Sequence, residues 1–382
     1  MKKFLAISFL TEFSGQLFFF TLPLIAIKYG ASTQQLGILG SVTALFYIPF
    51  SILFGVLAGK QLKVNFPLIS ATIFSLFIAM TMLSNSVRVL YFIAAAAGIS
   101  LAGFWPPLMV QMNKETEGKN TGEIVGKFSA AWSIGTIFGP IVAGFLYQQY
   151  ILAPLMLSAF LFLCIVFILS TVKSSPSIVK KITQDNKKDT PVSDIKTLVA
   201  AYIGTFAVYF SFGAVRNLFP KLAVDIGLQP YVIGLLFSIM DTFRTITFFV
   251  FSQREHFYQK PFSFVAFGFF AYFSLSWLIF TNSVLLFAMN FILLGGILCG
   301  IYYSYALHTA FTIKKGRAIA VGIFEAVIGI GVGSGSLVGG MLTFWLGERA
   351  PYIVSMIIGI VFSVIQITLV RNKNSLLQKK VS

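Results

Sequence analysis

The sequence predicts an all-α integral membrane protein, with twelve transmembrane helices arranged as two six-helix pseudo-symmetric bundles. Three observations predict this class: an apolar composition, twelve long apolar runs, and a repeat that relates the two halves of the chain. Of the 382 residues, 57% are hydrophobic and only 10% are charged, whereas a soluble domain carries about 25% charged residues. The composition therefore excludes an ordinary soluble enzyme.

Each apolar run is long enough to form a membrane-spanning helix, which needs about 20 residues. The runs are continuously apolar rather than alternating, which argues against a β-barrel. Helices are expected because lipid offers no hydrogen-bond partner to an unpaired backbone group. The twelve predicted spans are residues 4–28, 34–59, 66–84, 89–111, 126–147, 151–172, 197–219, 230–252, 262–280, 284–311, 318–345 and 351–370.

The net charge of +16 would suggest a nucleic-acid partner in a soluble protein. With the N-terminus in the cytoplasm and the spans alternating, however, 22 of the 28 Lys and Arg residues fall on the cytoplasmic side. Loops on that side of a membrane carry such an excess. The sequence therefore predicts a multi-pass protein of the cell membrane with both termini in the cytoplasm. Its expected partners are the lipid bilayer and a small molecule, with no nucleic acid.

A charged segment divides the spans into two sets of six. Residues 173–196 are rich in Lys and Asp and lack apolar periodicity, which is typical of a solvated loop. The predicted domains are an N-terminal bundle (1–172), this cytoplasmic linker (173–196), a C-terminal bundle (197–372) and a cytoplasmic tail (373–382).

The two halves also repeat in sequence. At an offset of 197, Pro23, Ala26, Gly30, Gly37 and Ser41 match Pro220, Ala223, Gly227, Gly234 and Ser238. At an offset of 196, Gly126, Phe128, Gly135, Gly139 and Gly144 match Gly322, Phe324, Gly331, Gly335 and Gly340. Ten matches at nearly one offset indicate an internal duplication. A parallel repeat of six spans is the architecture of two bundles that rock around a central site.

The fifth span carries the most specific motif, formed by Gly126, Gly135, Gly139, Pro140, Ala143 and Gly144. The eleventh span repeats it with Gly322, Gly331, Gly335, Ser336, Gly339 and Gly340. Small residues at this spacing let two helices approach closely. The pattern resembles the antiporter motif of the major facilitator superfamily, with Ala143 in place of one glycine. The resemblance covers the whole chain, and it implies secondary transport by alternating access, in the outward direction.

One part of the family pattern is missing. The loop between the second and third spans keeps Gly55, Lys60 and Lys63, but Gly59 stands where the family has an Asp. This departure leaves open a membrane sensor that does not transport.

Ionisable residues inside a membrane are costly and are therefore functional candidates. Glu12, with Gln16 one turn later, is a candidate for proton transfer or substrate contact, or alternatively a gate residue paired with a neighbouring helix. Asp241 and Arg244 share a face of the eighth span. They form either a structural ion pair or a pair that opens when Asp241 is protonated. Glu325 in the eleventh span is a candidate for proton coupling.

Aromatic residues are a further candidate set, namely Trp105, Trp132, Tyr302 and Tyr305, which fall in spans that line the cavity in the family. They favour an amphipathic or lipophilic substrate. Two smaller expectations concern Pro106–Pro107, which predict a break in the fourth span, and Arg216, which is expected to reach the membrane interface by snorkelling.

The residues together predict a secondary transporter that exports an amphipathic small molecule in exchange for protons and works as a monomer. Uptake of a small nutrient, such as a sugar or an organic anion, is the main alternative. An integral membrane enzyme is a further alternative, although enzymatic activity, a cofactor and a metal are not expected. A nucleotide-driven pump is excluded because the sequence lacks a GxxxxGK[ST] phosphate loop.

Overall fold

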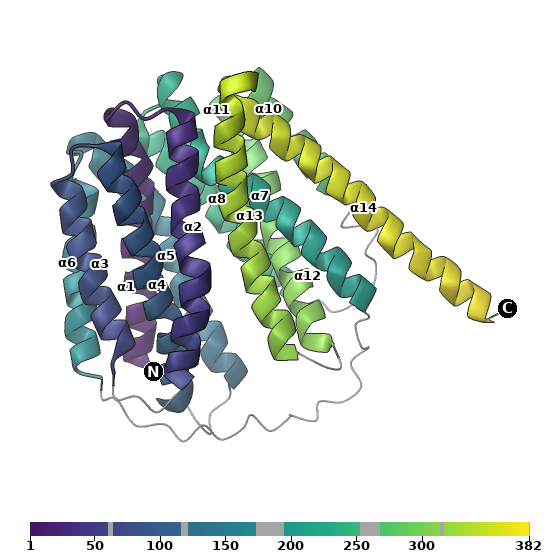
Figure 1. The fold of residues 1–382 in the computed structure, drawn as a ribbon, viewed down its shortest axis with the longest axis horizontal. Coiled ribbons are helices and arrows are strands. Elements are labelled where there is room, and N and C mark those ends of the chain that lie inside the picture. Colours follow the sequence, from purple (N-terminus) through teal and green to yellow (C-terminus); the bar gives the residue numbers. More distant parts are fainter. Residues whose placement is uncertain (60–63, 116–120, 173–194, 253–267, 314–316, 382) are drawn as a thin grey trace. The chain divides into compact units, whose positions relative to one another are not determined.

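The computed structural model describes residues 1–59, 64–115, 121–172, 195–252, 268–313 and 317–381, and within them every regular element is a helix (Figure 1). Ten helices in this described part are long and apolar enough to cross a membrane. Two shorter apolar helices, Phe66–Met82 and Gly268–Phe280, correspond to the third and ninth predicted spans. Each of the twelve predicted spans therefore has a helical counterpart, and the all-α membrane class is confirmed.

The chain divides into two compact units. Unit 1 comprises Met1–Asp185 with Ala223–Ser238, and unit 2 comprises Asn186–Leu222 with Ile239–Ser382. One boundary of this division falls inside the segment predicted as a linker, and the other two fall in the seventh and eighth helices, so that Ala223–Ser238 is grouped with unit 1. In chain order the helices are α1 (Lys2–Lys28), α2 (Thr33–Gly59), α3 (Phe66–Met82), α4 (Val87–Glu115), α5 (Thr121–Gln149), α6 (Ala153–Ser170), α7 (Ile195–Asp225), α8 (Pro230–Ser252), α10 (Ser276–Phe280), α11 (Val284–Asn290), η2 (Phe291–Leu298), α12 (Cys299–Thr312), α13 (Arg317–Leu346) and α14 (Ala350–Val381).

The repeat is visible in how α1 and α7 end. Gly30 follows α1 and Gly227 follows α7, with φ angles of 79° and 81°. A side chain would be strained in this left-handed conformation, which glycine adopts readily. The same turn at matched positions of both halves supports the duplication.

Glycines of the motif bring neighbouring helices into close contact in both units. A Cβ atom added at Gly135 of α5 would lie 2.8 Å from the backbone oxygen of Phe9 on α1. A Cβ added at Gly331 of α13 would lie 3.1 Å from the backbone oxygen of Phe206 on α7. Phe9 and Phe206 are themselves 197 residues apart. The helix pairs α1–α5 and α7–α13 therefore pack in the same register, through residues without side chains.

Aromatic side chains fill the interior of each unit. In unit 1, the ring of Phe74 on α3 lies 5.2 Å from Phe18 on α1 and 4.7 Å from Phe162 on α6. In unit 2, the ring of Phe219 on α7 lies 4.8 Å from Phe291 on η2. These edge-to-face contacts give van der Waals packing, which has to hold membrane helices together where lipid supplies no hydrophobic driving force.

The predicted break at Pro106–Pro107 is wrong, because α4 runs through both prolines as one helix. Each proline removes a backbone donor from the carbonyl four residues earlier, which leaves the carbonyls of Ala102 and Gly103 without that partner. The Ser70 hydroxyl of α3 lies against Gly103. A membrane helix can continue past proline where neighbouring helices surround it in this way.

The tenth predicted span is one continuous helical rod, but its middle part is wound differently. The π-helical segment η2 lies between α11 and α12 and contains Gly295 and Gly296. The Thr247 hydroxyl of α8 donates to the Gly296 carbonyl oxygen at 3.1 Å. The wider winding of η2 and the absence of side chains at Gly295 and Gly296 place this rod directly against α8. This is the helix that carries Asp241.

Candidate functional site

Glu12 and Gln16 lie one turn apart on α1, in unit 1. The Gln16 side-chain amide donates to Glu12 Oε1 at 2.7 Å, and the Thr136 hydroxyl of α5 lies 3.4 Å from the same oxygen. Thr136 also donates to the Trp132 carbonyl at 3.1 Å, so its contact with Glu12 is the weaker one. Both Glu12 and Gln16 are half-buried. The carboxyl group is thus held in place while part of its side chain stays accessible.

The glycine motif of α5 packs onto the turn of α1 that carries this carboxyl group. A Cβ atom at Gly135 would lie 3.1 Å from the Glu12 Cβ, and one at Gly139 would lie 3.1 Å from the Gln16 Cγ. This close approach brings Thr136 within reach of Glu12. Gly126 differs from these residues, because a Cβ atom there would meet nothing within 4 Å. Close packing therefore explains Gly135 and Gly139 but not Gly126.

Further along the same helix, Gly144 and Pro140 contact the beginning of α8. A Cβ atom at Gly144 would lie 2.9 Å from the Tyr231 Cα, and one at Gly234 would lie 3.0 Å from the carbonyl carbon of Pro140. In unit 2, the Gly335 backbone lies similarly close to Phe210 of α7. The motif thus places α5 against two different helices.

Asp241 is the fully buried acidic residue of unit 2, and two arginines surround it. The Arg216 guanidinium of α7 donates to Asp241 Oδ2 at 3.0 Å. Arg244 Nη2 lies 3.0 Å from Oδ1, although this contact is not aligned as a hydrogen bond. The Arg244 guanidinium also lies 5.3 Å from the ring centre of Phe212, at cation–π distance. The ion pair that the three-residue spacing predicted is present.

The expected snorkelling of Arg216 is wrong. Its side chain is 16% exposed and points to the buried carboxylate of Asp241, because a charge buried in a membrane helix needs an opposite charge. Sequence spacing could not find this partner, since Asp241 is 25 residues away on the next helix. Removing one member of a buried pair leaves an uncompensated charge, which costs about 3–5 kcal/mol.

Glu325 lies on α13 of unit 2, and its side chain is exposed. Tyr209 of α7 is buried and lies against Gly331 of the same helix α13, where an added Cβ atom would lie 3.0 Å from the Tyr209 Cβ. Tyr209 was not among the residues predicted from the sequence. The repeat contained the signal, because Tyr209 occupies the position of Glu12 at an offset of 197.

The candidate aromatic residues lie at different depths. Trp105 and Trp132 are half-buried, and Trp105 packs edge-on against Phe128 at 6.2 Å. Tyr302 and Tyr305 are only 1% and 4% exposed. Their contribution to a substrate cavity stays a prediction.

A packing role accounts for the buried Tyr302. Its hydroxyl donates to Gln366 Oε1 of α14 at 2.9 Å, and Gln366 Nε2 donates to the Ala200 carbonyl of α7 at 2.7 Å. This chain of hydrogen bonds links α12, α14 and α7 inside unit 2.

The twelve apolar helices, with acidic residues held inside both units, define a multi-pass integral membrane protein of the transporter class. The sequence profile of the Major Facilitator Superfamily matches residues 4–303, which is more than half of the chain. The chain therefore belongs to the major facilitator superfamily of secondary transporters, and the resemblance seen in the glycine motifs is confirmed.

Two curated relatives are the multi-drug resistance efflux pump PmrA from the TIGR4 and R6 strains of Streptococcus pneumoniae. Each is 23% identical to this chain over 244 residues, which is 61% of this chain and 61% of the relative. The match thus spans less than two thirds of the length of these relatives, and the homology is distant.

Solved structures share the fold over nearly the whole chain. A bacterial homolog of the human lysosomal transporter Spinster, in an inward-facing and occupied conformation, has a TM-score of 0.78 and 15% identity, and the match covers 97% of this chain and 96% of that one. The nucleoside transporter NupG has a TM-score of 0.70 and 16% identity, with 97% and 99% covered. At such low identity these likenesses establish the fold alone.

Proposed function

We propose that this secondary transporter exports an amphipathic small molecule in exchange for protons, by alternating access, and that Glu12 is the carboxylate at which the proton and the substrate compete. One observation carries the proposal: the antiporter-type motif of α5 packs directly onto the turn of α1 that bears Glu12 and Gln16. A helix that slides or bends along this face would change the surroundings of the Glu12 carboxyl group.

The hydrogen bonds around Glu12 suit a group that changes its charge. Glu12 Oε1 accepts from the Gln16 amide, and a carboxyl oxygen can accept such a bond in either the ionised or the protonated form. Proton uptake therefore need not break this contact. The PmrA relatives are multi-drug resistance efflux pumps, which supports the outward direction.

Sealed inside-out membrane vesicles test the proposal with a pH-sensitive dye and a panel of amphipathic compounds. We expect an added substrate to dissipate a preformed pH gradient, and Glu12→Gln to abolish this response. The proposal of proton coupling fails if a transported compound moves equally well after the proton gradient has been collapsed.

A second candidate function is uptake of an organic anion. It is favoured by the two guanidinium groups that meet at Asp241, because their side chains are 15–16% exposed whereas the carboxylate is buried. The accessible side of this cluster is therefore cationic. Competition by organic anions in the same vesicle assay distinguishes the two candidates.

The topology is part of the proposal. The excess of Lys and Arg on one side supports a topology with both termini in the cytoplasm and a location in the cell membrane. Reporter fusions to the N-terminus and the C-terminus test this orientation, which is wrong if either reporter is accessible from outside intact cells.

A further inference from the structure

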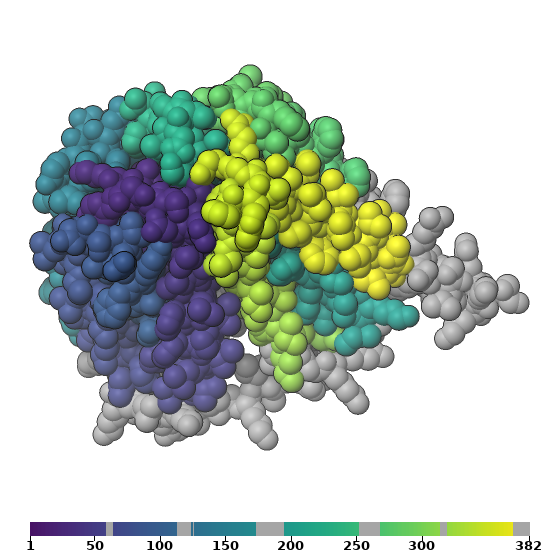
Figure 2. All heavy atoms as spheres, turned by 45° about the horizontal axis from the view of Figure 1, so that its top comes forward, coloured from purple at the N-terminus to yellow at the C-terminus, as the bar shows by residue number. Residues whose placement is uncertain are grey.

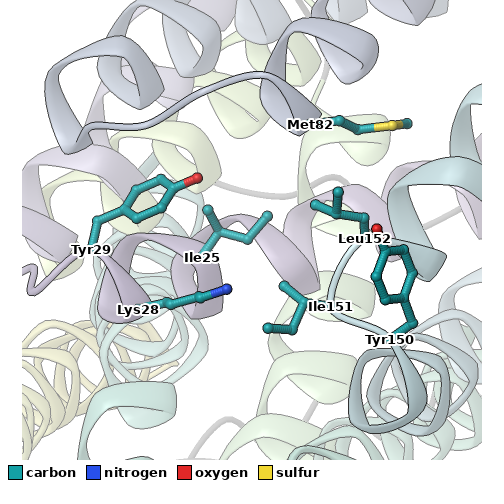
Figure 3. A pocket seen from close by; sticks show the side chains of 7 residues that line it. All are labelled: Ile25, Lys28, Tyr29, Met82, Tyr150, Ile151 and Leu152. Atoms are coloured by element: carbon teal, nitrogen blue, oxygen red, sulfur yellow. The ribbon is translucent and has the colours of Figure 1, made fainter.

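A pocket with a volume of about 290 Å³ lies at the end of unit 1 that is opposite the N-terminus. It is formed by the end of α1, the end of α3 and the turn between α5 and α6 (Figure 3). In Figure 2, the purple atoms around the end of α1 lie between the blue atoms of the α3–α4 segment and the blue-green atoms that follow α5. The lining residues are Ile25, Lys28, Tyr29, Met82, Tyr150, Ile151 and Leu152.

The lining combines one positive charge with aliphatic and tyrosine side chains. Lys28 is exposed, and its ammonium group points into the pocket beside Ile25 and Ile151 (Figure 3). None of the seven lining residues is acidic. The Tyr29 hydroxyl donates to the Ser84 carbonyl at 2.5 Å, which fixes the ring at the edge of the pocket. The lining therefore offers one cation beside apolar and aromatic side chains.

The pocket lies at the level where a membrane meets water. Lys28 is the last residue of one candidate span. Of the two other spans beside the pocket, one ends at Gln149 and the next begins at Ala153. Tyrosines gather at this level of membrane proteins, among the lipid headgroups. Tyr29 and Tyr150 fit this pattern. Phospholipid phosphates lie at the headgroup level of a membrane, so the acyl chains of a lipid bound here would run toward the apolar span residues.

Basic residues are scarce on the non-cytoplasmic side, where the predicted topology places Lys28. Each of them therefore calls for a structural or functional explanation. Arg349 of unit 2 has a structural reason, since it donates to the carbonyl oxygens of Leu278, Ile279 and Thr281 at 2.9 Å. The structure gives Lys28 no ion pair or hydrogen bond with any residue that it describes. Its charge is therefore available to a ligand.

We propose that this pocket is a binding site for an anionic phospholipid of the adjacent leaflet. The phosphate contacts the Lys28 ammonium, and an acyl chain lies along Ile25, Met82 and Leu152. Basic pockets between membrane helices bind lipid headgroups in this way, and each Lys near the surface contributes about 1 kcal/mol. The site is separate from Glu12 and does not depend on the proposed transport reaction.

Native mass spectrometry of the full chain in detergent tests the site, with phosphatidylglycerol, phosphatidylcholine and glycerol phosphate as probes. We expect Lys28→Gln to weaken binding of the first phosphatidylglycerol about fivefold, and Lys28→Arg to retain it. Arg88→Gln is the matched control, because Arg88 is an exposed cation at the same end of unit 1 but does not line the pocket. It should bind as the unmodified protein does.

Three results would overturn the proposal. Equal losses in Lys28→Gln and Arg88→Gln would mean a diffuse attraction of charge without a site. Equal affinity for phosphatidylcholine would mean that the phosphate of an anionic lipid is not recognised. Displacement of the lipid by glycerol phosphate would assign the pocket to a soluble anion instead. A thermal unfolding midpoint of Lys28→Gln within the error of the unmodified protein verifies that the variant is folded.

Discussion

Glu12 in unit 1 and Asp241 in unit 2 are both carboxylates inside membrane helices, but their surroundings differ. Glu12 is half-buried and accepts a hydrogen bond from the neutral Gln16 amide. Asp241 is fully buried between two guanidinium groups at 3.0 Å. A change of charge at Glu12 preserves its bond to Gln16, whereas protonation of Asp241 would abolish two ion pairs. On the basis of this difference we propose that Glu12 is the carboxylate that switches its charge and that Asp241 has a structural role.

The two units nevertheless share their helix packing. Gly135 and Gly331 lie against matched phenylalanines of α1 and α7, while the position of Glu12 is taken by Tyr209 in unit 2. The close helix contact at these glycines leaves no room for a side chain in either unit. The polar position beside them differs between the two units, and our proposed roles for the units rest on this difference.

The largest expected effect is on stability, at Asp241. Asp241→Asn leaves Arg216 and Arg244 without their carboxylate, so we expect the free energy of unfolding to fall by about 3 kcal/mol. The thermal unfolding midpoint of the purified protein measures this loss. The double variant with Arg216→Gln should recover part of it, because one buried charge is removed. An Asp241→Asn protein as stable as the unmodified one would contradict a structural role.

Glu12→Gln should lower transport and leave the stability of the protein nearly unchanged. The side chain keeps its shape and its hydrogen bond to Gln16, so the unfolding midpoint should change little. Gradient-driven export should fall about a hundredfold, the lower end of what a positioned proton-transfer group contributes. Vesicle transport measures this, with Glu348→Gln, in the turn before α14, as the control acid. Full export by Glu12→Gln would remove the distinction between the two carboxylates.

The shared packing predicts equal damage in both units. At both Gly135 and Gly331, a single added Cβ atom would lie 3.0 Å or less from a neighbouring helix. Gly135→Leu and Gly331→Leu should therefore each lower the free energy of unfolding by about 1–3 kcal/mol. Gly126→Leu has open space at its Cβ position and should change stability by less than about 0.5 kcal/mol. Folded yield and unfolding midpoints measure all three. If Gly126→Leu is as damaging as the others, the contact geometry is not the cause.

The smallest expected effect is at Thr136. Its hydroxyl contacts Glu12 at 3.4 Å but already donates to the Trp132 carbonyl at 3.1 Å. Thr136→Val should therefore cost about 0.5 kcal/mol, the low end of a hydrogen bond, and change export rates by less than about threefold. Initial rates across a pH series measure this. A loss as large as that of Glu12→Gln would make Thr136 part of the proton path.

The helical spans and the internal repeat could be predicted from the sequence. The side-chain partners on neighbouring helices could not. The twelve spans follow from apolar runs of sufficient length, and the glycine register follows from the repeat. The partner of Arg216 depends on how α7 faces α8, which no local spacing encodes. The continuity of α4 through Pro106–Pro107 and the π-helical winding of η2 depend on how neighbouring helices pack against them. Tyr209 could have been predicted from the sequence, because the repeat maps it onto Glu12.

The most direct test of the central claim is the number of protons released when a substrate binds to the purified protein in weakly buffered solution. A compound found by thermal stabilisation serves as the substrate. If the substrate and a proton compete for Glu12, binding to the unmodified protein releases protons, and binding to Glu12→Gln releases none. Equal proton release by Glu12→Gln would contradict the account and would move the coupling carboxylate elsewhere in the chain.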